Sequence, residues 1–201
     1  FLDMVEEKKV ASTYLVPTMI QGILDHPDFP KKDLSSLKSI GYGASPMPTK
    51  LLFRARELLA AEYTNYFGQT ESTGIISVLS PEDHRLEGSK ETIEKKAHRL
   101  AGIGRPIPEG EVRIVDEKDR EVPTGEVGEI VFRGKKVMKG YWGKKEATGA
   151  ALRGGWLHTG DLARMDEDGY LYLAGRKKDM IIRGGENIYP VEIENVLHSH
   201  P

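Results

Sequence analysis

The sequence predicts an α/β fold, in which part of a parallel β-sheet with covering helices is followed by a small β-rich, barrel-like unit. Two patterns predict it. Before about residue 100, short apolar strands alternate with segments whose apolar residues recur at helical spacing, which is typical of a parallel sheet. After Gly102, short strands are separated by turn residues, which indicates a small antiparallel unit.

The first elements read helix, strand, helix between Val5 and Asp25. Residues 12–16 form the short strand, and Pro17 stands at the start of the second helix, where proline is tolerated. The next strand, 37–44, ends in small residues. The apolar residues of 47–62 then recur at helical spacing, and the following strand, 63–67, completes a strand–helix–strand unit.

Later elements follow from caps and turns. Ser80-Pro81-Glu82-Asp83 is typical of a helix start, with a hydroxyl cap, a first-turn proline and acids near the positive end of the helix dipole. The charged segment 89–99 is expected to be a solvated helix or loop. Strands are predicted at 111–115, 128–133, 162–165 and 170–173, and the Asp-Gly pair within 166–169 marks a hairpin.

Composition narrows the class of protein. A net charge of −2 and a pI near 6.4 give no electrostatic reason for a nucleic-acid or anionic-membrane partner. The absence of cysteine excludes disulfides and thiol nucleophiles and fits a reducing compartment. No apolar run approaches the roughly 20 residues that span a bilayer, and the first residues lack the basic-then-apolar order of a signal peptide. We therefore expect a soluble, cytoplasmic protein, and both ends of the chain read as cut.

The stretch Asn65-Tyr66-Phe67-Gly68-Gln69-Thr70-Glu71-Ser72 suits a nucleotide and its metal. An aromatic ring can stack on a base, and Gly68 lets the backbone approach closely. Thr70 can donate to a phosphate oxygen, and Glu71 is a hard oxygen ligand of the kind that Mg²⁺ takes. Alone, the stretch is equally typical of a β-turn with a capped helix after it.

The segment 156–162 places Asp161 after a glycine turn, at the expected start of a strand. An aspartate there can accept both hydroxyls of a ribose, or it can simply cap its own turn. His158 is either a general base or a packing or surface residue. The segment 134–142, which ends in paired aromatics, is interpreted as a glycine-bracketed loop without a catalytic role.

The segment from Gly175 to Pro190 has two glycine-marked turns around a short apolar strand. Its basic start, Arg176 to Lys178, indicates a linker or hinge between units. Arg176 can be a surface residue in a salt bridge, or it can hold a ribose or a phosphate with its fork of donors.

Four motifs together resemble the adenylate-forming (AMP-binding) superfamily in order and spacing: Phe67 to Glu71, Gly128-Glu129-Ile130 with Gly140-Tyr141, Thr159 to Leu162, and Gly175-Arg176 through Gly184-Gly185-Glu186-Asn187-Ile188. The chain most resembles the acyl-CoA synthetases, or fatty-acid CoA ligases, over essentially its whole length. The resemblance implies three parts: the α/β sheet portion of an N-terminal domain (1–101), a barrel-like subdomain (102–174), and a hinge with the beginning of a C-terminal α+β domain (175–201).

The resemblance implies an enzyme that joins a carboxylic acid to the AMP of ATP, releases pyrophosphate, and then passes the acyl group to the thiol of CoA. ATP, Mg²⁺ and CoA are the implied cofactors, and a homodimer is left open. Such chemistry needs positioning and charge neutralisation and no covalent nucleophile.

The resemblance also implies a role for each matching residue. The nucleotide-binding residues are Gly43, Ala44, Ser45, Tyr66, Phe67, Gly68, Gln69, Thr70, Asp161 and Arg176. Phe67 stacks on adenine, while Asp161 and Arg176 bind the ribose hydroxyls. Thr70 contacts the α-phosphate and Glu71 holds Mg²⁺, which makes these two the catalytic residues.

Further roles concern the other substrates. Lys178 falls at the hinge of the family, where many members have aspartate, and Gly184 and Gly185 lie along the CoA tunnel. Tyr42, Gly43 and the stretch from Gly74 to Val78 wall the acyl pocket, and their small and apolar types suit a fatty or aryl acid.

Two parts of the family pattern are missing from these residues: the glycine- and Ser/Thr-rich phosphate loop and the C-terminal lysine. We therefore expect the chain alone to have little or no ligase activity. Two alternatives stay open. One is another adenylate-forming enzyme, luciferase-like or carrier-loading, and the other is a non-catalytic nucleotide-binding or interaction module.

Overall fold

The computed structural model describes residues 1–183, 186–190, 193, 196 and 197. Its chain divides into two compact units. Unit 1 comprises Phe1–Tyr66 and Leu79–Ala101, and unit 2 comprises Phe67–Val78 and Gly102–Pro201. One boundary falls inside a strand, after Tyr66, so the nucleotide motif that begins at Phe67 belongs to unit 2. The three-part division at 101/102 and 174/175 stays a prediction.

Unit 1 contains the parallel strands that the sequence predicts. Its first elements are α1 (Leu2–Lys8), β1 (Ser12–Leu15), α2 (Pro17–Leu24), the 3₁₀ turn η1 (Phe29–Lys31), β2 (Ser39–Gly43), α3 (Thr49–Leu58) and β3 (Glu62–Gln69). β1 pairs with β2 and β2 with β3, both in parallel. Helix α3 is shorter than the apolar pattern of 47–62. Pro48 keeps the preceding residue out of the helical region at its start, and Leu59 has an extended conformation at its end.

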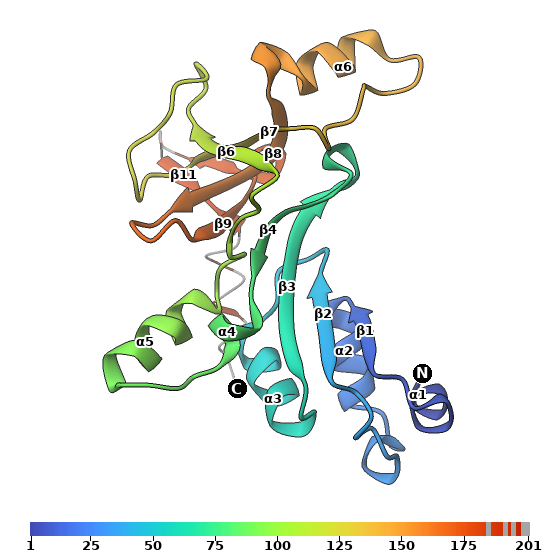
Figure 1. Cartoon of the computed structure of the whole chain (residues 1–201). Coiled ribbons are helices and arrows are strands. Elements are labelled where there is room, and N and C mark those ends of the chain that lie inside the picture. The colour runs from blue at the N-terminus through green and yellow to red at the C-terminus, as the bar shows by residue number, and fades with distance from the viewer. Residues whose placement is uncertain (184–185, 191–192, 194–195, 198–201) are drawn as a thin grey trace. The chain divides into compact units, whose positions relative to one another are not determined.

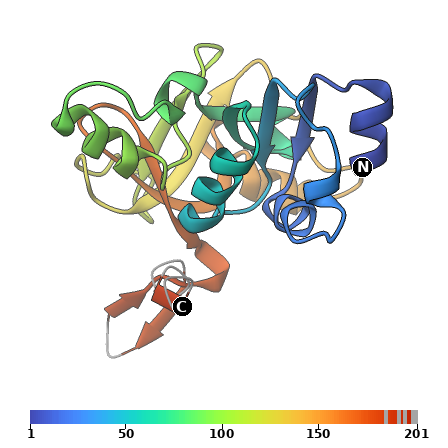
Figure 2. The ribbon, with the colours of Figure 1, turned by 90° about the horizontal axis from the view of Figure 1, so that it is seen from below.

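The core of unit 1 lies between these strands and the helices α2 and α3. Right-handed crossovers between neighbouring parallel strands place both helices on the same side, as Figures 1 and 2 show. The buried helix residues are Ile20, Ile23, Leu24, Leu51, Leu52 and Ala55. Each fully buried Leu or Ile side chain contributes about 1.5–3 kcal/mol relative to exposure.

Two more helices complete unit 1. Helix α4 (Pro81–His84) begins as predicted, because the Ser80 hydroxyl accepts a hydrogen bond from Asp83 N. Helix α5 (Lys90–Arg99) buries none of its residues, so the prediction of a solvated segment is confirmed.

Unit 2 is the predicted β-rich unit. Its elements are the 3₁₀ turn η2 (Thr70–Ser72), β4 (Gly74–Leu79), β5 (Arg105–Pro106), β6 (Gly110–Val115), β7 (Gly128–Gly134), α6 (Lys145–Ala151), the 3₁₀ turn η3 (Arg153–Gly155), β8 (Leu157–Met165), β9 (Leu171–Arg176), the 3₁₀ turn η4 (Lys177–Asp179), β10 (Ile181–Arg183) and β11 (Glu186–Ile188). β6, β7, β8 and β9 form an antiparallel sheet in that order. β4 pairs with β5 and β10 with β11, both antiparallel.

The core of unit 2 consists of two clusters, and the side chains of Phe67 and Val112 pack against both. One cluster holds Ile103, Ile114, Ile130, Ala163 and Leu171, and another holds Ile76, Phe132 and Leu157. The hairpin at 166–169 is confirmed: Asp166 N donates to Tyr170 O at 2.9 Å, and Gly169 has a φ of 80°. In the part of the chain that the structure describes, no helix is long and apolar enough to cross a membrane.

Candidate functional site

Unit 2 contains a cavity of about 450 Å³, a volume within the range of small-molecule sites. Its lining comes from stretches far apart in the sequence: Gln69, Glu71, Tyr141, His158, Thr159, Gly160, Arg176, Lys177 and Lys178. The cavity therefore brings together residues of all four motifs: Gln69 and Glu71 of the first, Tyr141 of the second, Thr159 and Gly160 of the third, and Arg176 of the fourth.

Two small residues, Gly68 and Ser72, fix the turn that carries Glu71. A Cβ atom on Gly68 would overlap the carbonyl oxygen of Gly74 and lie 2.9 Å from Ile75 Cα, so β3 and β4 approach more closely than any other residue allows. The buried Ser72 hydroxyl donates to Gln69 O and accepts from Gln69 N at 3.2 Å. Glu71 thus stands on a rigid 3₁₀ turn at the end of a strand.

Tyr141 is a site residue that the sequence analysis missed. Its phenol donates to Glu71 Oε1 at 2.7 Å, and Met138 N donates to Glu71 O at 2.8 Å. The hydrogen bond to the carboxylate raises the pKa of Tyr141, and partial burial adds to this. The segment 134–142, interpreted as a loop without a catalytic role, contributes Tyr141 to the lining of the cavity.

Asp161 lies on a bulge and not at the start of a strand, so that detail of the prediction is wrong. β8 begins at Leu157, and its pairing with β7 shifts between His158 and Leu162, which leaves three residues opposite Ile130 alone. Thr159 Oγ1 donates to Ile130 O at 2.8 Å and accepts from Asp161 N at 3.1 Å. Gly160 has a φ of 72°, a conformation that favours glycine.

The carboxylate of Asp161 binds Arg176. The register of β8 and β9 sets the two residues opposite each other, and Arg176 Nε donates to Asp161 Oδ1 at 2.7 Å. This contact raises the pKa of Arg176. Arg176 is thus a half-exposed residue in a salt bridge, as one of its two readings has it, and the ribose role of Asp161 and Arg176 stays a prediction.

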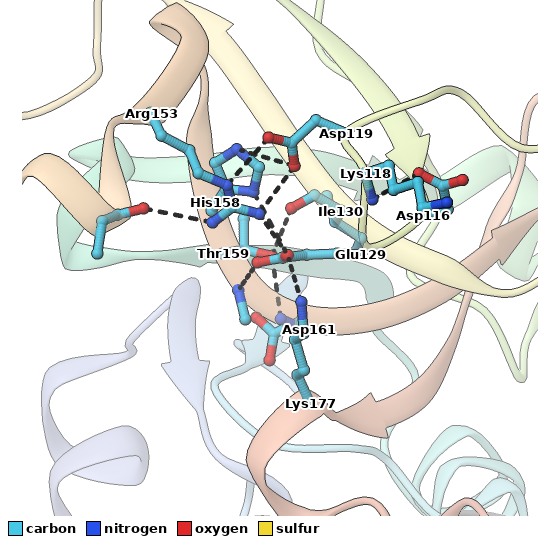
Figure 3. A network of polar contacts seen from close by, with 12 residues as sticks. Asp116, Lys118, Asp119, Glu129, Ile130, Arg153, His158, Thr159, Asp161 and Lys177 are labelled. Atoms are coloured by element: carbon cyan, nitrogen blue, oxygen red, sulfur yellow. Dashed lines mark hydrogen bonds and ion pairs between the residues drawn. The ribbon is translucent and has the colours of Figure 1, made fainter. Parts of the chain in front are cut away.

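A buried polar network lies beneath the bulge (Figure 3). Glu129 accepts from Gly160 N at 3.1 Å, and its second oxygen is 3.3 Å from His158 Nδ1 and 3.4 Å from Lys177 Nζ. Burial would raise the pKa of Glu129, but the Gly160 and His158 contacts and the charge of Lys177 outweigh it and hold this pKa below its ordinary value. The side chain of His158 is 5% exposed and lines the cavity.

Two predicted nucleotide residues of unit 2 have contrasting environments. Phe67 is half-buried and packs against both apolar clusters, while Thr70 is exposed at the start of η2. Lys178 lines the cavity from η4, and Gly74 has a φ of 101° at the start of β4. Gly184 and Gly185 lie outside the described residues.

The remaining predicted residues belong to unit 1. Gly43 pairs with Tyr66 in register, and a Cβ atom on Gly43 would lie 3.3 Å from the Tyr66 carbonyl carbon. Ala44 has a φ of 68°, and Ser45 is exposed. The Tyr42 side chain is fully buried, and its hydroxyl lies 2.8 Å from His84 Nε2. Their places in a nucleotide site or an acyl pocket stay predictions.

The carboxylates at the cavity fit a metal site in which the substrate supplies most of the ligands. Among the described residues, no group of three or more His, Asp or Glu side chains could hold a metal ion. Glu71 is thus a single carboxylate in the cavity wall, with Oε1 engaged by Tyr141. Because Mg²⁺ is commonly bound by one or two carboxylates together with substrate phosphates, Glu71 fits a metal that arrives with a nucleotide.

Comparison with known proteins gives consistent matches. The medium/long-chain-fatty-acid–CoA ligase FadD8 of Mycobacterium tuberculosis is 40% identical over 200 residues, which cover 100% of this chain and 33% of that protein. The structure of the amide bond synthetase McbA from Marinactinospora thermotolerans superposes with a TM-score of 0.86 at 36% identity, covering 100% of this chain and 38% of McbA.

A third match is the o-succinylbenzoate coenzyme A synthetase MenE from Bacillus subtilis, solved in complex with ATP and magnesium ion. Its TM-score is 0.81 at 34% identity, over 100% of this chain and 38% of MenE. The chain thus spans about a third of the length of the relatives it matches. The family model for AMP-binding enzymes matches residues 1–142. The chain therefore belongs to the AMP-binding enzyme family.

Proposed function

We propose that the chain is part of an ATP-dependent acid–thiol ligase. In the first step a carboxylate oxygen attacks the α-phosphorus of ATP, the bond between the α-phosphorus and the bridging oxygen breaks, and pyrophosphate leaves. In the second step the thiol of CoA loses its proton, its sulfur attacks the acyl carbonyl carbon, and AMP leaves. The observation that supports this most is the single cavity that Glu71 and the Asp161-bound Arg176 share.

Each residue in or beside the cavity that the proposal uses then has a task. Asp161 and Arg176 hold the ribose hydroxyls, and Thr70 donates to the α-phosphate. Glu71 holds Mg²⁺, which supplies positive charge next to the phosphates when bound. Lys177 and Lys178 add two cations at the cavity wall, where negative charge gathers during attack on phosphorus.

The other assignments complete the proposal. Gly43, Ala44 and Ser45 border the adenine, Tyr66, Phe67, Gly68 and Gln69 shape its site, Lys178 is the hinge, and Gly184 and Gly185 line the CoA tunnel. Tyr42 and Gly74 wall the acyl pocket. The enzyme is cytoplasmic and takes ATP, Mg²⁺, CoA and a small carboxylic acid.

The acid is fatty or aryl. The relative FadD8 is named for medium- and long-chain fatty acids, and MenE is named for o-succinylbenzoate, an aromatic acid. A second candidate differs in the acceptor of the acyl group. The likeness to McbA, an amide bond synthetase, favours testing an amine beside the thiol of CoA.

The test is ATP–pyrophosphate exchange by the full-length protein with a panel of fatty and aryl acids. We expect acid-dependent exchange, followed by thioester formation with CoA. If exchange occurs but an acyl product forms only when an amine is supplied, the result would favour the second candidate. No exchange with any acid, together with no saturable nucleotide binding, would favour a non-catalytic interaction module and contradict the proposal.

We expect the 201-residue chain alone to give no exchange above background, because its sequence contains no glycine- and Ser/Thr-rich phosphate loop. The same assay with the purified chain checks this. Exchange at more than a trace of the full-length rate would contradict it, and it would show that another part of these residues holds the triphosphate.

A further inference from the structure

Glu129 has no task in the proposed reaction and does not line the cavity, yet its side chain contacts several residues that do. Its side chain is 6% exposed, on β7 between Gly128 and Ile130, which are also buried. Taking a carboxylate out of water costs several kcal/mol unless donors and cations replace the water. The structure supplies such partners, and three of them line the cavity.

One oxygen of Glu129 holds the bulge of β8. Oε1 accepts from Gly160 N at 3.1 Å, one peptide unit before Asp161. The other contact from β7 to this bulge is the one from Thr159 Oγ1 to Ile130 O. Because a bulge changes the direction in which its side chains point, a group that fixes Gly160 also fixes the direction of Asp161.

The other oxygen of Glu129 faces the side-chain nitrogens of a lysine, a histidine and an arginine (Figure 3). Oε2 lies 3.4 Å from Lys177 Nζ, 3.3 Å from His158 Nδ1 and 3.5 Å from Arg153 Nη2. Arg153 makes closer contacts with Asp119, at 2.8 and 3.1 Å. Lys177 directly follows Arg176 in the chain, so the charge of Glu129 restrains the segment that carries the partner of Asp161.

We infer that Glu129 is a positioning residue for the nucleotide, since it holds Gly160 and Lys177 and thereby sets Asp161 and Arg176 for the two hydroxyls of a ribose. The inference rests on the proposed function and deepens it. Glu129 thus controls the recognition of the ribose, although it does not line the cavity. A group with a merely structural role would instead change the affinity for every nucleotide equally.

The test compares ATP with 2′,3′-dideoxy-ATP by calorimetry on the full-length protein. We expect the wild type to prefer ATP by about tenfold, the effect of charge-assisted hydrogen bonds to the ribose. Glu129→Ala should reduce this preference to within about twofold. Glu129→Gln keeps an oxygen that can accept from Gly160 N, so it should retain most of the preference.

Two controls sharpen the test. Glu126→Ala removes an exposed carboxylate from the loop before β7 and should leave the preference unchanged. In an Asp161→Ala background, Glu129→Ala should cause no further loss, because the two residues act on the same contact. If Glu129→Ala does not fold, as judged by circular dichroism, Glu129→Asp takes its place, since it withdraws the carboxylate by one methylene group.

The outcomes separate the inference from the proposed function. A wild-type preference that Glu129→Ala keeps, or an equal loss of affinity for both nucleotides, overturns the inference alone. A wild type that does not distinguish the two nucleotides overturns the inference and the ribose role of Asp161 and Arg176 as well.

Discussion

Gly68 shows how a single missing side chain shapes the cavity. Any Cβ atom there would overlap backbone atoms of Gly74, and a backbone contact cannot be relieved by a change of rotamer. The sequence predicts that Gly68 lets the backbone approach closely, and the structure has such an approach. The segment that comes close to Gly68 is the start of β4. Glu71 depends on that packing because its 3₁₀ turn joins the two strands.

We expect Gly68→Ala to lower the free energy of unfolding by about 1–3 kcal/mol, because β4 must move away to accept the methyl group. Urea denaturation measures the change. Gly149→Ala is the matched control, since a Cβ atom at that position in α6 has no neighbour within 4 Å and should stabilise the helix slightly. Equal stability of the wild type and Gly68→Ala would contradict the packing argument.

Tyr141 makes a second residue-level prediction. Its phenol fixes one oxygen of Glu71 at 2.7 Å, which orients the carboxylate before any metal binds. Tyr141→Phe should weaken Mn²⁺ binding to the ATP-saturated full-length protein by about three- to tenfold, as paramagnetic resonance would measure. Trp142→Phe, at the fully exposed neighbouring position, should change nothing. Unchanged or tighter metal binding by Tyr141→Phe would show that Tyr141 does not orient Glu71.

At the level of strands, two register shifts build the site. The bulge between Glu129 and Val131 on β7 and their partners on β8 takes residues 159–161 out of regular pairing, and the shift between β8 and β9 still sets Asp161 opposite Arg176. A regular ladder would pair the amide of Gly160 or its neighbours with β7 backbone, whereas the bulge lets Gly160 N donate to the Glu129 side chain. The left-handed φ of Gly160 allows the bulge.

Helix α4 carries a buried histidine that should make unit 1 sensitive to acid. His84 is 2% exposed, lies within hydrogen-bond distance of the Tyr42 hydroxyl and Ser80 O, and stacks on Tyr63. Burial lowers the pKa of His84, and the hydrogen bond to Ser80 O and the charge of Asp83 offset this only in part, while Arg56 adds to it. Below about pH 6.5 the unfolded chain takes up a proton that the folded chain does not.

The free energy of unfolding should therefore fall as the pH drops below about 6.5, by at most about 1.4 kcal/mol per pH unit from this group. Denaturation curves at pH 7 and pH 5 measure the slope. In His84→Gln the slope should be smaller, whereas the exposed His98→Gln should keep the wild-type slope. A His84→Gln slope equal to that of the wild type would contradict the assignment.

For the molecule as a whole, local signals in the sequence predict elements, while the contacts that make the site depend on tertiary structure. Hydrophobic periodicity and turn residues were enough for the parallel strands, the Ser80 cap and the 166–169 hairpin, because these depend on neighbours within a few positions. The predicted C-terminal end of α3 is wrong, because Leu59 fits the helical period but α3 ends at Leu58.

The site divides in the same way. Glu71, Asp161 and Arg176 could be predicted because their motifs are ordered and specific. Tyr141 and Glu129 could not be assigned, because their partners are 70 and 31 residues away and meet them only through the pairing of strands and the course of a loop. A shift of one residue in the register of β7 would send the Glu129 side chain to the other face of the sheet.

The most direct test of the central claim is a calorimetric titration of the chain with a non-hydrolysable acyl-adenylate mimic, in the wild type and in Asp161→Ala. If Glu71, Asp161 and Arg176 share one nucleotide site, the wild type binds the mimic saturably and Asp161→Ala binds it at least about tenfold more weakly. Equal affinity of the two proteins, or no saturable binding by the wild type, would contradict the account.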